Sequence, residues 1–244
     1  MTTTIEGKKI KEKDKKDNLE INPEEMLKMG LHFGHRLSQI HPKMKDYVSG
    51  IKNGVYVIDL EKTAEKLKNA IEFIKKVVSE GKTLLLVGTK VQTKDITKKI
   101  AKECGFPYIT ERWLGGTLTN FKTIKKRIDY FKDLEGRKNK GELEKYTKKE
   151  KIKIEKELKD LEKKFEGIKD MSQIPDAIFV LDVKKDNLAV KEAKRKGIKI
   201  IAITDTNNDP SLIDYPIPAN DDAVSSVTYI LEKVKEAIIK EKSN

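Results

Sequence analysis

The alternation of short apolar runs with amphipathic segments is the feature that most constrains how this chain folds. The runs GVYVIDL (54–60), TLLLVG (83–88), PDAIFVLD (175–182) and IKIIAITD (198–205) each lead, directly or after a loop, to a segment whose apolar residues recur every three or four positions. Buried strands of a parallel sheet read as continuous apolar runs, and amphipathic helices connect them. The alternation therefore predicts an α/β fold, with a parallel sheet covered by helices on both faces.

One segment of about fifty residues breaks this alternation, because it contains no strand pattern. It carries two heptad-like stripes: Phe121, Ile124, Ile128 and Phe131, then Ile154, Leu158, Leu161, Phe165 and Ile168. Thr147 and Glu150 have the spacing of a capping box at the start of the second helix. Each stripe is one seam wide, so we expect 120–167 to form an antiparallel coiled-coil hairpin that projects from an α/β domain of 22–119 and 168–244. The alternative is that both helices pack flat on the sheet.

The beginning of the chain differs in composition from the rest. Residues 1–21 are rich in charge and poor in apolar side chains, which predicts a flexible lysine-rich arm. In the segment NPEEMLKMG that follows, Asn22 is suited to cap a helix and Pro23 to occupy its first position. We therefore expect a short helix that ends at Gly30.

The net charge of +12 favours a polyanion as the partner. The apolar runs are too short to span a bilayer, and the segment GKKIKEKDKKDN (7–18) lacks the apolar core of a signal peptide, so we expect a cytoplasmic protein without membrane contact. The single cysteine, Cys104, cannot form an internal disulfide, in agreement with a reducing compartment. Its position at a helix end, with no histidine nearby in sequence, favours a small core residue over a nucleophile.

Motifs for catalysis or nucleotide binding are weak. Gly88, Thr89 and Lys90 follow an apolar run but lack the remaining glycine and Lys-Ser/Thr pattern of a phosphate-binding loop. Asp205 and Asp209 follow another run, where they are suited either to Mg²⁺ or to an Asx turn closed by Pro210, and we favour the turn. We expect no catalytic residue and no cofactor. The alternative is a cytoplasmic α/β enzyme that binds a nucleotide or a phosphorylated metabolite and uses the hairpin as a lid.

All three histidines lie in the stretch MGLHFGHRLSQIHPKMK (29–45). His32 and His35 are three residues apart, but the cationic side chains of Arg36, Lys43 and Lys45 argue against a zinc site. At least one histidine is suited to a structural role, through ring nitrogens bonded to the backbone. With Gly34 permitting close approach and Phe33 able to stack, the stretch favours a loop that contacts a nucleic-acid backbone.

The segment TERWLGGTLTN (110–120) lies where the hairpin begins. Gly115 and Gly116 predict a turn, and Trp113 is expected to seal the junction between the hairpin and the sheet. The neighbouring Arg112 is expected to contact phosphate.

Five blocks of this sequence resemble the bacterial-type ribosomal protein S2 family. They are MLKMGLHFGHRLSQIHPKMKDYVSGIKNGVYVIDLEKT (26–63), LLLVGTK (84–90), ERWLGGTLTNFKT (111–123), GIKDMSQIPDAIFVLD (167–182) and AITDTNNDPSLIDYPIPANDDAVSSV (202–227), and the resemblance runs from about Met26 to Ile239. It implies a flavodoxin-like five-stranded parallel sheet with a coiled-coil protrusion. It also implies a non-enzymatic constituent of the small (30S) ribosomal subunit that binds 16S ribosomal RNA at the junction of head and body.

The resemblance has further implications for partners and contacts. Neighbouring small-subunit proteins, including the large RNA-binding ribosomal protein one, are expected partners, and a homo-oligomer is not expected. The residues that we expect to contact RNA are His32, Phe33, Gly34, His35, Arg36, Lys43, Lys45, Lys90 and Arg112.

Overall fold

A five-stranded parallel sheet forms the centre of the computed structural model, which describes residues 21–243. Its strands are β4 (Leu84–Val87), β5 (Tyr108–Ile109), β6 (Ala177–Val180), β7 (Lys199–Thr204) and β8 (Tyr215–Pro218), in the spatial order β5-β4-β6-β7-β8. All neighbouring pairs are parallel. Numbered within the sheet, this is the 2-1-3-4-5 order of flavodoxin-like folds, which confirms the predicted fold class.

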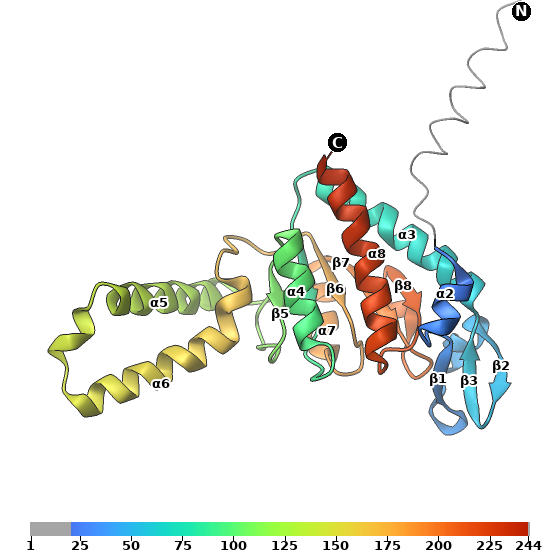
Figure 1. Ribbon diagram of the computed structural model, residues 1–244, viewed down its shortest axis with the longest axis horizontal. Helices are drawn as coiled ribbons and strands as arrows, with labels where there is room; N and C mark the ends of the chain where they lie inside the picture. The colour runs from blue at the N-terminus through green and yellow to red at the C-terminus, as the bar shows by residue number, and fades with distance from the viewer. Residues whose placement is uncertain (1–20, 244) are drawn as a thin grey trace, which may run out of the picture.

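Helices cover both faces of the sheet (Figure 1). One face is covered by α3 (Leu60–Ser79), α4 (Lys94–Cys104) and α8 (Val224–Ser243), which share a core with alternate strand residues such as Leu84 and Leu86. The other face is covered by α7 (Asn187–Lys196) and the inner end of the helical insertion, which pack against the intervening residues such as Leu85 and Val87. The alternation of strand side chains thus divides the interior into two apolar layers.

The run at 54–60 does not belong to the parallel sheet, contrary to our expectation. It forms β3 (Val55–Ile58) of a separate antiparallel sheet with the order β1-β3-β2, in which β1 is Phe33–Arg36 and β2 is Val48–Lys52. Strands β2 and β3 are joined at Asn53 and Gly54, both with positive φ, which is the backbone that a two-residue hairpin turn requires. Most of β2 is exposed, so the described residues do not cover both faces of this sheet.

The two strands that complete the parallel sheet were not apparent in the sequence. Strand β5 is only two residues long, and β8 contains Pro216 and Pro218. Proline cannot donate to a strand ladder and is therefore confined to positions such as the edge strand that β8 provides.

The helical insertion projects away from the sheet (Figure 1). It consists of α5 (Phe121–Asn139), the short turn η3 (Glu142–Lys145), α6 (Lys148–Phe165) and η4 (Glu166–Ile168). The two long helices run antiparallel and side by side, and the predicted capping box of Thr147 and Glu150 is present. The side chains buried along the seam between the two helices are Ile124, Ile128, Phe131, Leu134, Leu158, Leu161 and Phe165. We call this segment the hairpin; its supercoiling and its independence as a domain stay predictions.

The remaining local predictions can be compared with the described residues. Helix α2 (Pro23–Lys28) is present, and the Asn22 side chain accepts a hydrogen bond from the Glu24 amide. Cys104 is buried at the end of α4, where Gly105 adopts a left-handed conformation. The predicted arm lies outside the described residues apart from Ile21. Within the described part, no helix has both the length and the apolarity that a membrane span requires.

Candidate nucleic-acid interface

The stretch 29–45 exposes its basic side chains, while its backbone is hydrogen-bonded to another part of the protein. It contains β1, the 3₁₀ turn η1 (Leu37–Gln39) and most of a second, η2 (Pro42–Tyr47), at the end of the molecule opposite the hairpin tip (Figure 1). The side chains of Arg36, Lys43 and Lys45 are exposed, and that of Phe33 is 48% exposed. Met44, by contrast, is fully buried. We call the segment 33–45 the basic loop.

The basic loop is fastened to the turn that follows β7. The backbone amide of His35 donates to Thr206 Oγ1 at 2.8 Å, and that of His41 donates to the Thr206 carbonyl oxygen at 2.8 Å. A Cβ atom on Gly34 would lie 2.6 Å from Thr206 Cγ2, so a larger residue would push the two segments apart. Gly34 therefore makes room for the Thr206 side chain, and the expected close approach of RNA at this glycine stays a prediction.

Both ring nitrogens of His35 have partners within the protein, but these are side chains and not the backbone groups that we expected. Its Nδ1 lies 3.2 Å from Asp205 Oδ1, and its Nε2 lies 2.9 Å from Asn207 Nδ2. The hydrogen bond to Asp205 raises the pKa of the imidazole, against the opposing effect of burial. His35 thus fastens the basic loop to the turn that follows β7, and its contact with RNA stays a prediction.

The other two histidines lie apart from this site. The ring of His32 packs on Phe33 with centroids 3.9 Å apart, and burial followed by the charge of Lys52 lowers its pKa. His41 accepts a long hydrogen bond of 3.4 Å from the Lys43 amide and faces Asp209 at 3.9 Å. Across residues 21–243, no group of three or more acidic, histidine or cysteine side chains has an arrangement suited to a metal ion.

The three basic side chains of the loop differ in their surroundings. Lys43 Nζ lies 3.0 Å from Asp209 Oδ2 and 2.6 Å from Ser211 Oγ. Arg36 and Lys45 form no ion pair with any residue that the structure describes. Two of the three cations are thus unneutralised, and the third is held in place by a carboxylate.

Lys90, which we expected to contact RNA, is paired with carboxylates of the protein. Its ammonium lies 2.9 Å from Asp182, 3.0 Å from Asp221 and 2.6 Å from Asp222, and only 15% of the side chain is exposed. The charge of this lysine is therefore neutralised within the protein. Because carboxylates surround it on the folded chain, Lys90 is less suited to an RNA contact than an exposed cation is, and its contact with RNA stays a prediction.

The same cluster makes the carboxyl edge of the sheet acidic. Burial, and then the charges of Asp182 and Asp205, raise the pKa of Asp221 to about 7, against the opposing effect of Lys90. Thr89 Oγ1 donates to the buried Asp186 at 2.8 Å. A phosphate entering this edge would meet carboxylates, which argues against a nucleotide site at Gly88–Lys90.

Asp209 forms the turn that we favoured for this segment. Its carboxylate accepts from the amide of Ser211 at 3.0 Å and caps the 3₁₀ turn η5 (Pro210–Leu212). The Ser211 hydroxyl is the main cause that lowers the pKa of Asp209 to about 2. Asp205 is buried and bonded to His35 and Thr206.

The junction with the hairpin matches the sequence prediction in part. Trp113 is buried, Arg112 is exposed beside it, and Gly116 has a φ of +92°, which favours glycine. Gly115 has no such requirement. The residue that sequence reasoning missed is Glu192 on α7, which receives the indole N–H of Trp113. The sequence feature that could have identified Glu192 is its position on the apolar face of a helix, with Ala189 and Ala193 on the same face.

The chain was compared with known proteins. A family model described as ribosomal protein S2 matches residues 26–241. Small ribosomal subunit protein uS2 of Dictyoglomus thermophilum is 49% identical over 218 residues, which cover 89% of each chain. The proteins of that name from Coprothermobacter proteolyticus and Geotalea uraniireducens are 45% and 46% identical, over 88% and 90% of this chain and 80% and 86% of their own lengths. The five-stranded sheet and the hairpin both lie within residues 26–241 that the family model matches, and the chain belongs to the ribosomal protein S2 family.

Proposed function

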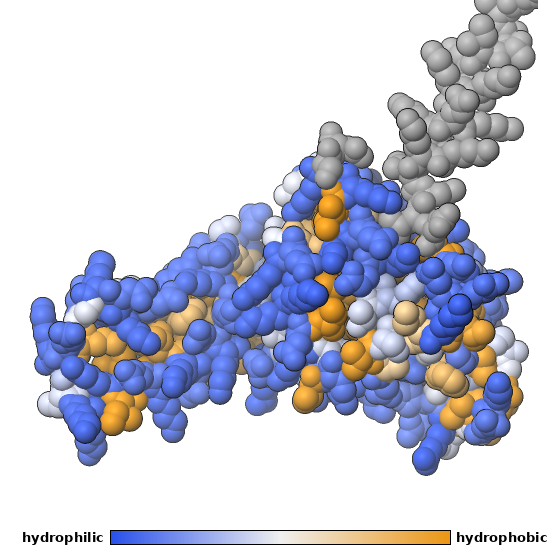
Figure 2. Space-filling view, viewed as in Figure 1, coloured by the Kyte–Doolittle hydropathy of each residue, from blue (hydrophilic) through white to orange (hydrophobic). Residues whose placement is uncertain are grey.

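We propose that this chain is a non-enzymatic structural constituent of the small ribosomal subunit and that its basic loop binds 16S ribosomal RNA. Membership of the ribosomal protein S2 family and the shared name of the relatives support the ribosomal role. The net charge of +12 agrees with a partner of high negative charge. Figure 2 shows mainly hydrophilic side chains over the visible surface, with an apolar stripe between the two helices of the hairpin.

One observation carries the RNA contact: the basic loop exposes its cations while its backbone is held by the protein. Thr206, His35 and the buried Met44 fix the loop from below. Arg36, Lys43 and Lys45 then face outward on a backbone that need not be ordered on binding, which lowers the entropic cost of association. The exposed ring of Phe33 at the end of the loop offers a surface on which an unpaired base stacks.

Arg112 supplies a second contact in this proposal, since it is exposed beside the root of the hairpin. The proposed location is the junction of head and body, on ribosomes in the cytoplasm. The proposed protein partners are neighbouring small-subunit proteins, including the large RNA-binding ribosomal protein one. Association with another copy of this chain has no part in the proposal.

The enzyme alternative is disfavoured by the sheet edge where its ligand would bind. Ligands of open α/β sheets bind at the carboxyl ends of the strands. Here that position is filled by Lys90 and its three aspartates. Pairing of the lysine with carboxylates neutralises the cation that would have received a phosphate group.

The test is a triple variant, Arg36→Ala, Lys43→Ala and Lys45→Ala. The logarithm of the binding constant falls linearly with the logarithm of the salt concentration, and we call the steepness of this line the salt slope. Removing one phosphate contact lowers the salt slope by about 0.9 on duplex DNA and by about 0.7 on single strands. Because Lys43 is paired with Asp209 in the free protein, we expect the slope to fall by roughly two. Affinity for 16S ribosomal RNA would be measured over a salt series.

A matched control removes the same charge elsewhere, with Lys68→Ala, Lys191→Ala and Lys240→Ala at exposed helical positions. We expect this control to alter the slope much less than the loop variant does. Equal effects of the two triple variants would mean that net charge, and not the basic loop, governs binding.

A further inference from the structure

A buried carboxylate lies beneath the loop that leads into the hairpin. Glu192 on α7 is 5% exposed and forms no ion pair within the described residues. Burying an ionised group without a counter-ion is costly unless hydrogen bonds replace its water. The side chain must therefore be satisfied by donors from the protein.

The donors all come from the segment 113–119. Glu192 Oε1 accepts from Trp113 Nε1 at 3.1 Å and from the Gly116 amide at 2.8 Å. Glu192 Oε2 accepts from the Leu118 amide at 3.0 Å and from both the amide and the hydroxyl of Thr119 at 3.1 Å. Five donors thus converge on one carboxylate, immediately before α5 begins.

These hydrogen bonds keep the carboxylate ionised. Burial by itself raises the pKa of Glu192, but the amides of Gly116, Leu118 and Thr119, together with the Trp113 indole, outweigh it and hold the pKa below its ordinary value. The contact is therefore charge-assisted, the stronger class of hydrogen bond.

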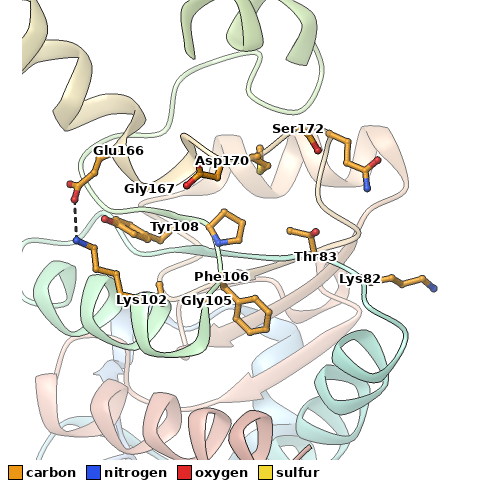
Figure 3. Close-up of a pocket in the computed structure, with 14 residues that line it drawn as sticks. Lys82, Thr83, Lys102, Gly105, Phe106, Tyr108, Glu166, Gly167, Asp170 and Ser172 are labelled. Carbon is orange, nitrogen blue, oxygen red and sulfur yellow. Dashed lines mark hydrogen bonds and ion pairs between the residues drawn. The ribbon is translucent and has the colours of Figure 1, made fainter. Parts of the chain in front are cut away.

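The other end of the hairpin is fixed by different means. Gly167 lies against the backbone of Tyr108 so closely that a Cβ atom would lie 2.5 Å from Tyr108 Cδ2 and closer still to the Tyr108 carbonyl oxygen. Glu166 pairs with Lys98 at 2.7 Å and Lys102 at 3.1 Å. Figure 3 shows Glu166 directed at Lys102, beside Tyr108 and Gly167. These four residues belong to the lining of a cavity of about 540 Å³. Contacts at this end are thus steric at Gly167 and ionic at the part-exposed Glu166, whereas those at Glu192 are buried hydrogen bonds.

We propose that Glu192 is the positioning residue that sets the direction in which the hairpin leaves the α/β domain. Its carboxylate ties the segment before α5 to α7, which itself packs on the sheet. Helix α5 is 19 residues long and so extends about 28 Å. A change of about 10° at its root would therefore move the tip by about 5 Å.

Only a carboxylate satisfies these donors. In Glu192→Gln, an amide N–H₂ group replaces one oxygen and faces two or three N–H and O–H donors that then lack an acceptor. The volume of the side chain is preserved, so the variant changes hydrogen bonding and little else. Glu155→Gln, at an exposed position on α6, is the matched control.

The test measures the hairpin angle directly. Spin labels would be attached to cysteines at Lys140, next to the hairpin tip, and at Lys68 on α3, in a Cys104→Ala background, and their distance distribution recorded by double electron–electron resonance. We expect a narrow distribution in the parent and in the Glu155→Gln protein. In Glu192→Gln we expect a distribution broadened or displaced by about 5 Å, the lever-arm value given by the helix length.

An unchanged distribution in Glu192→Gln would overturn the proposal, since apolar packing would then suffice to set the angle. If Glu192→Gln lacks cooperative unfolding, Thr119→Val is a less disruptive test of the same hydrogen bonds, because it removes one donor, the Thr119 hydroxyl, and leaves the carboxylate intact. Broadening in Thr119→Val supports the proposal, and a parental distribution contradicts it. Amide hydrogen exchange gives a second readout: reduced protection confined to Gly116, Leu118 and Thr119 indicates positioning, whereas a uniform reduction indicates general destabilisation and contradicts the proposal.

The consequence for assembly rests on the proposed function. Ribosomal subunits lacking this protein would bind Glu192→Gln more slowly than the parent, because the hairpin and the basic loop would no longer be held in one arrangement. If the parent itself fails to bind, the proposed function fails, while the distance measurement still decides the role of Glu192.

Discussion

Gly167→Ala is expected to be the most destabilising methyl addition at the root of the hairpin. Gly167 lies in η4, where the chain returns from α6 and covers β5, an edge strand of the sheet. The added methyl would lie 2.5 Å from Tyr108 Cδ2 and 2.7 Å from Tyr108 Cε2. The closest atom is the Tyr108 carbonyl oxygen, which belongs to a strand paired with β4 and so cannot move alone.

The expected magnitude follows from the geometry. Overpacking a well-filled site costs about 1–3 kcal/mol when side chains can adjust. Here the backbone of β5 or of η4 must shift by roughly 1 Å or more to restore a normal contact of about 3.5–4.0 Å, so we expect the free energy of unfolding to fall by about 3 kcal/mol or more.

Gly136→Ala provides a control of opposite sign within the same hairpin. Gly136 lies in α5, and no atom lies within 4 Å of its added Cβ. Alanine in a helix interior is favoured over glycine by about 0.5–1 kcal/mol, so this variant should be slightly more stable than the parent.

Urea unfolding, followed by circular dichroism and by Trp113 fluorescence, gives both free energies. Trp113 is buried next to the hairpin root and so reports on this region. A Gly167→Ala protein within about 1 kcal/mol of Gly136→Ala would refute the reasoning, because the root would then have to be loosely packed against β5.

Two further predictions concern the acidic cluster and the hairpin. The pKa of Asp221 is raised from its ordinary value of 3.8 to about 7 in the folded protein. Between these two pH values the folded protein holds a proton that the unfolded chain has released, so the free energy of unfolding should fall as pH rises from about 4 to about 7. Asp221→Asn should flatten this dependence in urea unfolding at pH values of about 4.5 and 7.5, and parallel pH profiles of the two proteins would contradict the assignment. Replacing residues 122–166 by a short glycine-rich linker is expected to leave a folded α/β domain, because the outer seam residues of α5 and α6 mostly bury one another. An absence of cooperative thermal unfolding in that variant would mean that the hairpin is part of the core.

Periodic elements of the fold were predictable from local sequence. The apolar runs of β4, β6 and β7, the seams of α5 and α6, and the capping box at Thr147 each contain their signal within a few residues. Strand β5 has too few residues to show a pattern, and the prolines of β8 conceal one. The run at 54–60 was assigned to the wrong sheet because an apolar run does not specify its partner strand, although Asn53 and Gly54 signalled a hairpin.

The site was less predictable, because its contacts join segments far apart in the sequence. Exposure of Arg36, Lys43 and Lys45 was inferred correctly from their residue types. Nothing near Lys90 indicated that carboxylates 92 to 132 positions away would enclose it, as Asp182 and Asp222 do. Likewise, the need for Gly34 depends on Thr206, which only the assembled sheet edge brings into contact. Residue type predicts which side chains are exposed to solvent, whereas the topology of the fold determines which distant side chains contact one another.

The central claim is that this chain is a constituent of the small ribosomal subunit, and sedimentation tests it most directly. A tagged copy would be expressed at a low level, and its cell extract separated on a sucrose gradient at low and moderate salt. We expect the tag to sediment with the small subunit and with whole ribosomes, and the Arg36, Lys43 and Lys45 triple alanine variant to shift toward the top of the gradient as salt rises. A parent protein found only among free proteins at the top of the gradient, at both salt concentrations, would contradict it.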